Sequence, residues 1–236
     1  MPQPHERIIV ALDVPTSREA LHLVDEIGDL VTFYKVGLEL LMGGGMEALL
    51  RTLVQRKRVF VDLKLPNDIP TTVSNAVRVA SELGVKFLTL SHSVSDVTIR
   101  AAIQGRGERS DPKLLLVPVL SSLDKNDFAR ETGLDASQFG SDLVRRATGA
   151  KQAGVDGFII SGPEIGLLRA TFPGVTLVSP AIRPAGTPTD DHKRSCSPGE
   201  AIRLGADYIV VGRPIRDAKD RRDAAKRIID EIGAET

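Results

Sequence analysis

The sequence predicts an α/β protein in which eight parallel strands close into a single (β/α)8, or TIM, barrel. Short β-branched runs alternate with segments of helical spacing, eight of each. Runs such as Phe158–Ile160 and Leu114–Val117 are apolar on both faces, as expected for strands covered on both sides. The 236 residues match the length of eight such units, and no low-complexity linker divides them. We therefore assign residues 1–236 to one barrel domain.

The predicted strands share β-branched and other apolar residues in short runs. In chain order they are Ile8–Asp13, Thr32–Gly37, Val59–Lys64, Phe87–Ser91, Leu114–Leu120, Gly157–Ser161, Thr176–Pro180 and Tyr208–Val211. A doubly wound open sheet is the alternative arrangement. The absence of a Gly-x-Gly-x-x-Gly motif after the first strand weakens it as a dinucleotide-binding fold.

The predicted helices are amphipathic, and several stop at a glycine, which readily adopts the left-handed conformation that ends a helix. They are Ser17–Ile27, Met46–Gln55, Thr71–Leu83, Val94–Gln104, Ser141–Ala153, Pro163–Thr171, Pro198–Leu204 and Asp217–Ile232. The expected stop signals are Gly28, Gly84, Gly105, Gly154 and Gly205.

Composition excludes several classes of protein. The 31 basic and 31 acidic residues cancel, whereas a nucleic-acid-binding surface normally has a basic excess. The single cysteine, Cys196, excludes an internal disulfide and multi-cysteine zinc patterns. No apolar run approaches membrane-spanning length, and Met1–Arg7 lacks the apolar stretch of a secretory signal. We therefore expect a cytoplasmic protein that does not bind nucleic acid or membranes.

Polar residues gather where the predicted strands run into the following loops, which is where active sites of such barrels form. Asp62 and Lys64 are two apart on strand three, so their side chains should share a face. Lys35, on strand two, would join them if it points inward. A solvated surface strand would show the same alternation, but the flanking Val59–Val61 indicates burial. Buried charges are retained where they pair with one another, often for catalysis or binding.

The segment from Ser179 to Arg194 is long, polar and rich in Gly and Pro, as is typical of a functional loop. It follows strand seven, and Val211–Arg213 follows strand eight. The loops after these two strands often bind phosphate in barrels of this kind. Arg183 and Arg213 are thus candidates for a phosphate clamp. The alternative is that both are ordinary surface arginines.

These residues resemble the orotidine 5'-phosphate decarboxylase family over nearly the whole chain. The specific feature is an Asp-x-Lys pair followed by a second Asp, a pattern of the wider superfamily. The matching pieces, whose order and spacing agree, are Ala11–Asp13, Tyr34–Gly37, Asp62–Lys64, Asp68–Pro70 with Thr72, Leu120–Ser122, Pro180–Arg183 and Val211–Ile215.

The resemblance implies decarboxylation of orotidine 5'-phosphate to UMP, a step of de novo pyrimidine biosynthesis, with no cofactor and no metal. It implies that Lys64 protonates C6, that Asp62 lies beside the substrate carboxylate, and that Lys35 orders the charges. Asp68 and Thr72 would reach into the neighbouring subunit's site, making the enzyme a homodimer with shared active sites. The remaining contacts implied are Asp13 and Lys35 to the ribose, Ser121 to the pyrimidine, and Arg183, His192, Gly212 and Arg213 to the phosphate.

Two departures from the family pattern stand out. Three residues, Leu65–Asn67, separate Lys64 from Asp68 where the family has two. One added residue can shift the chain by roughly 3.5 Å, which affects the reach of Asp68. In addition, His192 replaces the usual Gln of the phosphate loop, although an imidazole can also donate to phosphate.

Three alternative functions are open at this point. A magnesium-dependent sugar-phosphate decarboxylase or synthase of the same superfamily would need a Glu on strand two, where this chain has Lys35. A non-catalytic phosphate-binding barrel is suggested only by the extra residue before Asp68. A Schiff-base aldolase would need a neutral Lys64, which adjacent carboxylates disfavour. His92, after strand four, is expected to be a packing residue rather than part of the site.

Overall fold

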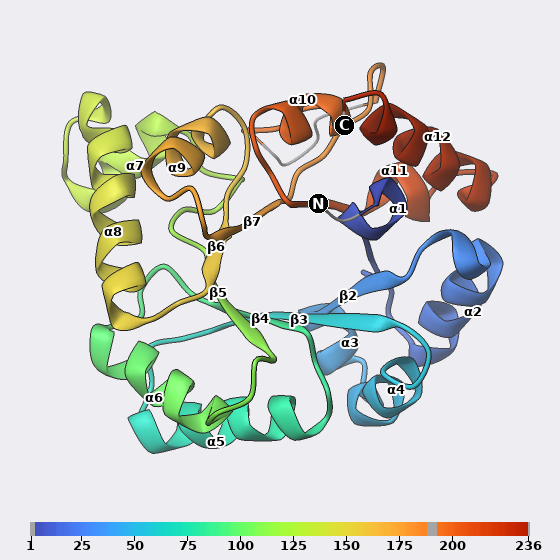
Figure 1. Cartoon of the computed structure of the whole chain (residues 1–236), viewed down its shortest axis with the longest axis horizontal. Helices are drawn as coiled ribbons and strands as arrows, with labels where there is room; N and C mark the ends of the chain where they lie inside the picture. The colour runs from blue at the N-terminus through green and yellow to red at the C-terminus, as the bar shows by residue number, and fades with distance from the viewer. Residues whose placement is uncertain (1–2, 188–192, 236) are drawn as a thin grey trace.

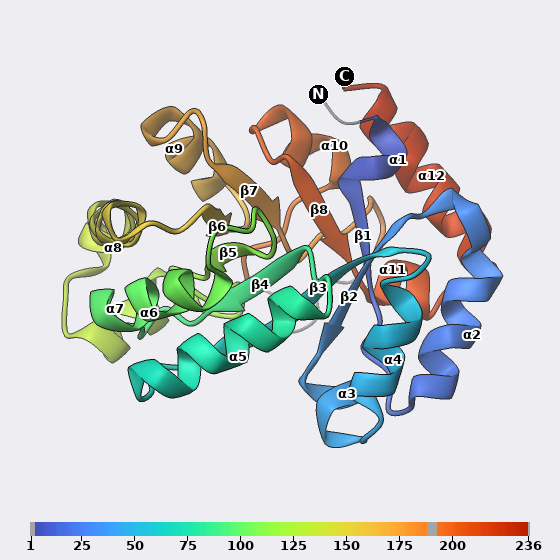
Figure 2. The same cartoon turned by 60° about the horizontal axis from the view of Figure 1, so that its bottom comes forward.

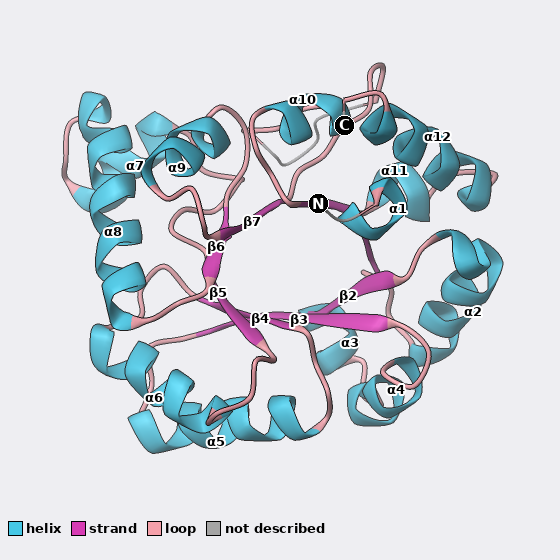
Figure 3. Cartoon of the chain, viewed as in Figure 1, coloured by secondary structure: helices cyan, strands magenta, loops and turns pink. Residues whose placement is uncertain are grey.

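The computed structural model describes residues 3–187 and 193–235, and these residues form the predicted closed barrel. Its eight parallel strands pair in sequence order, and β1 closes the ring by pairing with β8. The strands form the central ring and the helices surround it (Figures 1 and 3). The sequence prediction of a (β/α)8 barrel is therefore confirmed, and the open-sheet alternative is wrong.

The strands are short, as expected for a barrel whose loops carry the function. They are β1 (Ile8–Ala11), β2 (Phe33–Gly37), β3 (Arg58–Leu65), β4 (Phe87–Leu90), β5 (Lys113–Leu116), β6 (Gly157–Ile159), β7 (Thr176–Ser179) and β8 (Tyr208–Val211). Several predicted strands end earlier than expected. The sharpest case is β5, which stops at Leu116 rather than Leu120, next to Pro118, whose ring removes a ladder donor.

The helices that follow the strands match most of the predicted ones. The longer helices are α2 (Ser17–Ile27), α4 (Met46–Leu53), α5 (Pro70–Glu82), α6 (Asp96–Arg106), α7 (Lys125–Thr132), α8 (Phe139–Ala153), α9 (Glu164–Thr171), α10 (Pro198–Arg203) and α12 (Arg221–Gly233). The short ones are α1 (Pro4–Arg7), α3 (Leu38–Met42), α11 (Arg213–Arg216) and the 3-10 turns η1 (Gly28–Leu30) and η2 (Ala136–Gln138). Sequence spacing missed the short helices α1, α3 and α11, which hold too few turns to show an apolar stripe. It also missed α7, whose only buried residues are Asp127 and Phe128, and it began the last helix too early.

Gly105 has a different role from the predicted helix stop. It lies inside α6, which ends instead at Gly107 with φ +67°. A Cβ on Gly105 would lie 2.1 Å from the carbonyl oxygen of Ser74 on α5. The two helices lie side by side in both views (Figures 1 and 2). Gly105 therefore permits close helix packing, and this spatial requirement leaves no local sequence signal.

Alternate residues of each strand build two separate cores. Side chains such as Ile8 and Val10 point outward and pack beneath the helices. Ile9 and Ala11 point inward and join the barrel interior. The inner core ends in an aromatic layer at the amino ends of the strands. Its members are Phe33, Phe60, Phe87 and Tyr208, with the rings of Phe33 and Phe87 5.0 Å apart and those of Phe87 and Tyr208 5.2 Å apart.

The next inward-facing positions above this layer are polar. Lys35 follows Phe33 by two residues on β2, and Asp62 follows Phe60 by two on β3. Because side chains two apart on a strand share a face, these groups stand above the aromatic layer at the carboxyl end of the barrel. The fold thereby places charges over an apolar base.

Candidate active site

The carboxyl end of the barrel opens into a cavity of about 440 Å³, within the usual size range for small-molecule sites. Eight of the residues singled out in the sequence line it: Asp13, Lys35, Asp62, Lys64, Ser121, Arg183, Gly212 and Arg213. Asp68 and Thr72 are exposed and do not line it. His192 lies outside the described residues. The fold thus brings together residues that are up to 200 positions apart in the sequence.

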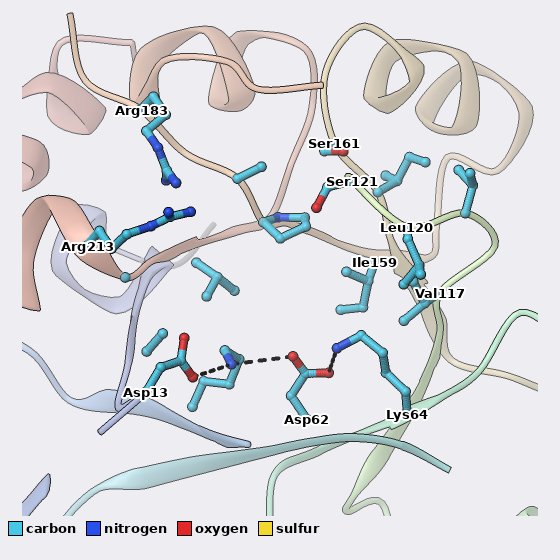
Figure 4. A pocket seen from close by; sticks show the side chains of 18 of the residues that line it. Asp13, Asp62, Lys64, Val117, Leu120, Ser121, Ile159, Ser161, Arg183 and Arg213 are labelled. Carbon is cyan, nitrogen blue, oxygen red and sulfur yellow. Dashed lines mark hydrogen bonds and ion pairs between the residues drawn. The ribbon is translucent and has the colours of Figure 1, made fainter. Parts of the chain in front are cut away.

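Four side chains form a continuous line of alternating charge on one wall, which we term the charge row: Asp13, Lys35, Asp62 and Lys64. The Lys35 Nζ lies 3.1 Å from Asp13 Oδ1 and 3.4 Å from Asp62 Oδ2. The Lys64 Nζ lies 2.9 Å from Asp62 Oδ1. Figure 4 shows the row running along the lower wall of the cavity. The predicted Asp between two Lys is therefore present, with Asp13 extending it.

Mutual pairing keeps the inner members of the charge row ionised. Burial alone would lower the pKa of Lys35, but Asp62 and Asp13 outweigh it and the pKa is raised. Burial would raise the pKa of Asp62, but Lys35, Lys64 and a hydrogen bond from Thr89 outweigh it and the pKa is lowered. Lys64 is the more open of the two lysines, with 38% of its side chain exposed against 12% for Lys35. A substrate can therefore reach the Lys64 ammonium directly.

A backbone irregularity, and not strand alternation alone, aims Lys64 at the cavity. The pairing of β3 with β4 shifts register between Val61 and Leu65, which indicates a bulge. Lys64 sits in this bulge with φ +49°, a left-handed conformation that costs a non-glycine residue roughly 1–2 kcal/mol. Such strain is typical of functional sites, where the surrounding structure holds it in place.

Thr89 on β4 holds this bulge and was missed by the sequence analysis. Its hydroxyl accepts a hydrogen bond from the Lys64 backbone N–H at 2.8 Å and donates one to Asp62 Oδ1 at 2.9 Å. The residue is fully buried. A signal existed, because Thr89 is the only polar residue in the apolar run Phe87–Leu90 and stands two positions after the inward-facing Phe87. Thr89 therefore fixes both the bulge and the orientation of Asp62.

Two arginines face the charge row from the opposite side of the cavity. Arg183 follows β7 and Arg213 follows β8, and Figure 4 shows their guanidinium groups pointing toward one another. Arg183 is buried, so its charge is directed inward. Gly212 lies beside Arg213 on the cavity wall. The alternative reading of surface arginines is wrong for Arg183, and both line the cavity as the phosphate-clamp hypothesis requires.

Two serines line the remaining wall, and one was unexpected. Figure 4 shows Ser121 pointing into the cavity from the segment after β5, as anticipated. Ser161, after β6, also lines the cavity but was only part of a predicted strand end. Its hydroxyl is buried and finds no hydrogen-bond partner within residues 3–187 and 193–235. Arg216, another lining residue missed in the sequence, donates to the carbonyl of Asp13 at 2.8 Å and so braces the end of β1.

The extra residue between Lys64 and Asp68 is accommodated by a side-chain anchor. The Asn67 side-chain oxygen accepts hydrogen bonds from the Ser95 backbone N–H at 2.9 Å and the Thr98 hydroxyl at 2.7 Å, both at the start of α6. The lengthened loop is thereby fastened to the neighbouring helix. Asp68 follows on the exposed surface, where its carboxylate accepts from the Ile69 backbone N–H at 2.6 Å.

His92 does not pack in the core, so the expectation for it was wrong. Its side chain is exposed and lines a second, polar cavity of about 260 Å³ with Asp96, Arg145 and Arg146. Strand β4 ends at Leu90, so His92 lies on a surface loop rather than on the strand. It does not line the main cavity.

Neither a metal cluster nor a membrane span appears in the part of the chain that the structure describes. Residues 3–187 and 193–235 contain no group of three or more His, Cys, Asp or Glu placed to hold a metal ion. None of the helices in these residues is both long and apolar enough to traverse a bilayer.

The sequence matches one protein family and relatives of known name. The model of the orotidine 5'-phosphate decarboxylase / HUMPS family matches residues 6–228. Orotidine 5'-phosphate decarboxylase of Rhodopseudomonas palustris (strain ATCC BAA-98 / CGA009) is 47% identical over 234 residues, which cover 97% of this chain and 94% of the relative. That of Methylorubrum extorquens (strain PA1) is 44% identical over 230 residues, covering 97% and 96%.

Solved structures give the same result. A crystal structure of orotidine 5'-phosphate decarboxylase from Lactobacillus acidophilus superposes with a TM-score of 0.81 at 32% identity, covering 96% of this chain and 99% of that one. An uncharacterized conserved protein from Geobacillus kaustophilus superposes with a TM-score of 0.79 at 28% identity. The chain belongs to the orotidine 5'-phosphate decarboxylase / HUMPS family.

Proposed function

We propose that this chain decarboxylates orotidine 5'-phosphate to UMP, and that the charge row performs the chemistry. The observation that carries the proposal is the pairing of Asp62 with both Lys64 and Lys35 on one wall, opposite Arg183 and Arg213. A substrate with a carboxylate at one end and a phosphate at the other matches this distribution of charge. Relatives of this name, 42–47% identical to the chain, support the same activity.

The polar residues around the cavity assign an orientation to the substrate. Arg183, Arg213 and the backbone of Gly212 would bind the phosphate, since planar guanidinium groups suit phosphate oxygens. Asp13 and Lys35 would bind the ribose hydroxyls. Ser121 would contact the pyrimidine edge. The pyrimidine C6 carbon then lies near the Lys64 ammonium.

In the reaction, the bond between C6 and the carboxylate carbon breaks and carbon dioxide leaves. The bonding pair remains on C6, in an orbital that the ring π-system cannot delocalise. The Lys64 ammonium stabilises this charge and transfers a proton to C6, giving UMP and a neutral amine that is reprotonated from water. Lys35 and Asp62 hold the ammonium in place beforehand, so little reorganisation accompanies the charge shift.

Asp62 contributes to the reaction through its fixed negative charge. Its pKa is lowered, so it remains ionised beside the bound carboxylate. Their repulsion disappears when carbon dioxide leaves. We assign the larger share of the rate acceleration to Lys64, because its charge is complementary to the developing carbanion.

Lys35 also distinguishes this site from a magnesium site of the wider superfamily. Its ammonium lies between the two carboxylates of the wall, 3.1 Å from Asp13 and 3.4 Å from Asp62. A divalent cation bound by these carboxylates would face that ammonium at close range and be repelled.

A decarboxylation assay in the presence of EDTA tests the proposal. The release of carbon dioxide from orotidine 5'-phosphate should proceed at the same rate with and without the chelator. Protein that binds UMP but releases no carbon dioxide would identify the chain as a non-catalytic phosphate-binding barrel. Loss of turnover in EDTA, restored by magnesium, would favour the metal-dependent alternative.

We also propose a homodimer in which each subunit completes its partner's site. Asp68 and Thr72 are exposed and outside the cavity of their own subunit, so they are available to a neighbouring one. Ile69, next to Asp68 in the chain, has 66% of its surface exposed, and Leu38 and Met42 on α3 have 58% and 83% exposed. Exposed large apolar residues of this kind are available to a protein interface.

Subunit mixing tests the shared sites. Lys64→Ala and Asp68→Ala chains, each nearly inactive alone, should regain roughly a quarter of wild-type activity when mixed in equal amounts and reassociated, because about half of the dimers are then mixed and each mixed dimer has one intact site of two. A mixture that stays inactive while forming mixed dimers would show that each site is built within one chain.

We also propose that the protein acts in the cytoplasm, a proposal that rests on the sequence alone, and fractionation of cells expressing the chain would test it.

A further inference from the structure

Arg194 is a buried charge on the loop between β7 and α10. Its side chain is only 8% exposed. The Nη1 atom lies 3.0 Å from Oε2 of Glu164, which is itself buried at the start of α9. A buried ion pair is costly to form and is rarely justified by stability alone. We therefore expect Arg194 to have a role besides stabilising the fold.

The other guanidinium donors of Arg194 fasten the segment that follows β5. Nε donates to the carbonyl of Leu123 at 2.8 Å, and Nη2 donates to the carbonyl of Leu120 at 2.8 Å. The Arg194 backbone N–H donates to the carbonyl of Ser121 at 3.2 Å. Arg194 thus binds main-chain oxygens at Ser121 and on both sides of it. A guanidinium suits this task because its donors point in several fixed directions.

This fastening matters because β5 ends at Leu116, well before Ser121. Ser121 therefore lies beyond the sheet, on a segment whose position the strand ladder does not fix. Hydrogen bonds from Arg194 replace the ladder at this point. They hold the main chain that carries the Ser121 side chain.

The same short segment also holds Arg183. The carbonyl of Cys196, two residues after Arg194, accepts a hydrogen bond from the Arg183 backbone N–H at 2.9 Å, and Ile182 pairs with Cys196 in a parallel bridge. The segment Arg194–Cys196 therefore links the main chain at Ser121 on one wall to the main chain at Arg183 on another.

We propose that Arg194 is a positioning residue of the decarboxylation: it fixes the loop carrying Ser121 against the loop carrying Arg183. The phosphate contact at Arg183 and the pyrimidine contact at Ser121 then lie at a fixed distance from each other, and this holds C6 near Lys64. This inference rests on the proposed function, which supplies the roles of Ser121 and Arg183. Arg194 itself does not line the cavity, so it acts through these neighbours.

Lys193, the preceding residue, provides a matched control. It also links the two loops, through ion pairs with Asp124 at 3.2 Å and Asp127 at 2.5 Å. Its side chain is 47% exposed, however, and its partners belong to the amino terminus of α7 rather than to the cavity wall. Asp127 is buried, but solvent reaches Lys193, and solvent-screened pairs have small effects. Lys193→Ala should therefore change kcat/KM less than about twofold.

The test is a double-mutant cycle between Arg194→Lys and Ser121→Ala. Lysine keeps a charge for Glu164 but cannot reach the carbonyls on both sides of Ser121. A misplacement of about 1 Å at a site can lower the rate about 100-fold, so we expect kcat/KM to fall 30- to 100-fold. Because Arg194 acts through Ser121, Ser121→Ala should cost much less in the Arg194→Lys background than in the wild type.

The outcomes separate the two proposals. Additive losses in folded, dimer-competent protein would overturn the positioning role of Arg194. If Ser121→Ala leaves kcat/KM unchanged in the otherwise wild-type protein, that result would instead refute the proposed contact of Ser121 with the pyrimidine. Should Arg194→Lys fail to fold, Glu164→Gln weakens the same anchor and leaves the Arg194 side chain in place. It should lower kcat/KM at least about fivefold with the same non-additivity, and additivity there would equally overturn the proposal.

Discussion

The two ends of the barrel use the same strands for opposite purposes. At the amino end, Phe33, Phe60, Phe87 and Tyr208 fill the interior with ring contacts. At the carboxyl end, the next inward positions carry Lys35 and Asp62, and the barrel opens into a cavity. One end is closed by apolar packing, and the other opens into a cavity lined by paired charges.

On the same strand, the residues that stabilise the fold therefore lie nearer the amino end, and the residues proposed to perform the chemistry lie nearer the carboxyl end. Phe33 and Lys35 are two residues apart on β2, as are Phe60 and Asp62 on β3. The aromatic layer excludes water from below, which strengthens every electrostatic interaction in the charge row above it. Substitutions at the two levels should therefore have different and separable consequences.

The largest expected effect is the loss of turnover in Lys64→Ala. Removing the ammonium eliminates both the stabilisation of the carbanion and its proton donor, so kcat should fall by a factor of at least about 10⁴. UMP should still bind, because the phosphate contacts are remote from Lys64. Steady-state kinetics and UMP titration measure the two. A rate within about tenfold of the wild type would refute the role of Lys64.

The opposite pattern is expected for Phe87→Ala at the closed end. Truncating this buried ring should lower the free energy of unfolding by about 3–5 kcal/mol, because a cavity replaces its contacts with three other rings. The folded fraction should retain kcat within about threefold of the wild type. Denaturant unfolding and kinetics on the same sample check both values. A stable protein with greatly reduced kcat would break the proposed separation of the two levels.

An intermediate effect is expected for Arg213→Ala on the phosphate side. Loss of a charged hydrogen-bonding partner should weaken binding of UMP by roughly 2–3 kcal/mol, or about 30- to 150-fold. Binding of uridine, which lacks the phosphate, should change little. Calorimetric titration with the two ligands provides the comparison. Equal losses for both would place Arg213 outside the phosphate site.

The smallest expected effect is the pH dependence of the stability that the charge row contributes. The pKa of Asp62 is lowered from 3.8, so its contribution is complete above pH 3.8 and is lost as the pH falls through the lower folded-state value. The pKa of Lys35 is raised from 10.5, so its contribution is complete below pH 10.5 and is lost as the pH rises through the higher value. Both are therefore constant between pH 5 and 9.

Denaturant unfolding of the wild type and of a Lys35→Met, Asp62→Asn double variant measures this contribution. The difference in unfolding free energy between them should stay constant within about 0.5 kcal/mol from pH 5 to 9. A change of more than about 1 kcal/mol across that range would mean that a member of the row titrates near neutrality.

Most of the fold and the charge row could be predicted because they depend on local pattern. Short β-branched and apolar runs identified the eight strands, and the positions of Asp62 and Lys64 at a strand end indicated a site. The chain's resemblance to a known family added the residues of the phosphate side. Eight of the proposed site residues do line one cavity.

The remaining features depend on contacts between distant segments, which leave little trace in the sequence. The left-handed Lys64 is held by Thr89, 25 positions away, and the packing role of Gly105 depends on the Ser74 carbonyl. Arg194 looks like any cation in a polar loop, and only the structure shows that it reaches Leu120 and Glu164. Asn67 likewise explains how an extra loop residue is accommodated.

The most direct test of the central claim is a crystal structure with UMP bound. We predict the Lys64 Nζ within about 3–3.5 Å of C6, with Asp62 still paired to both lysines and the phosphate at Arg183 and Arg213. A complex in which the Lys64 ammonium points to bulk solvent, more than about 6 Å from C6, would contradict it.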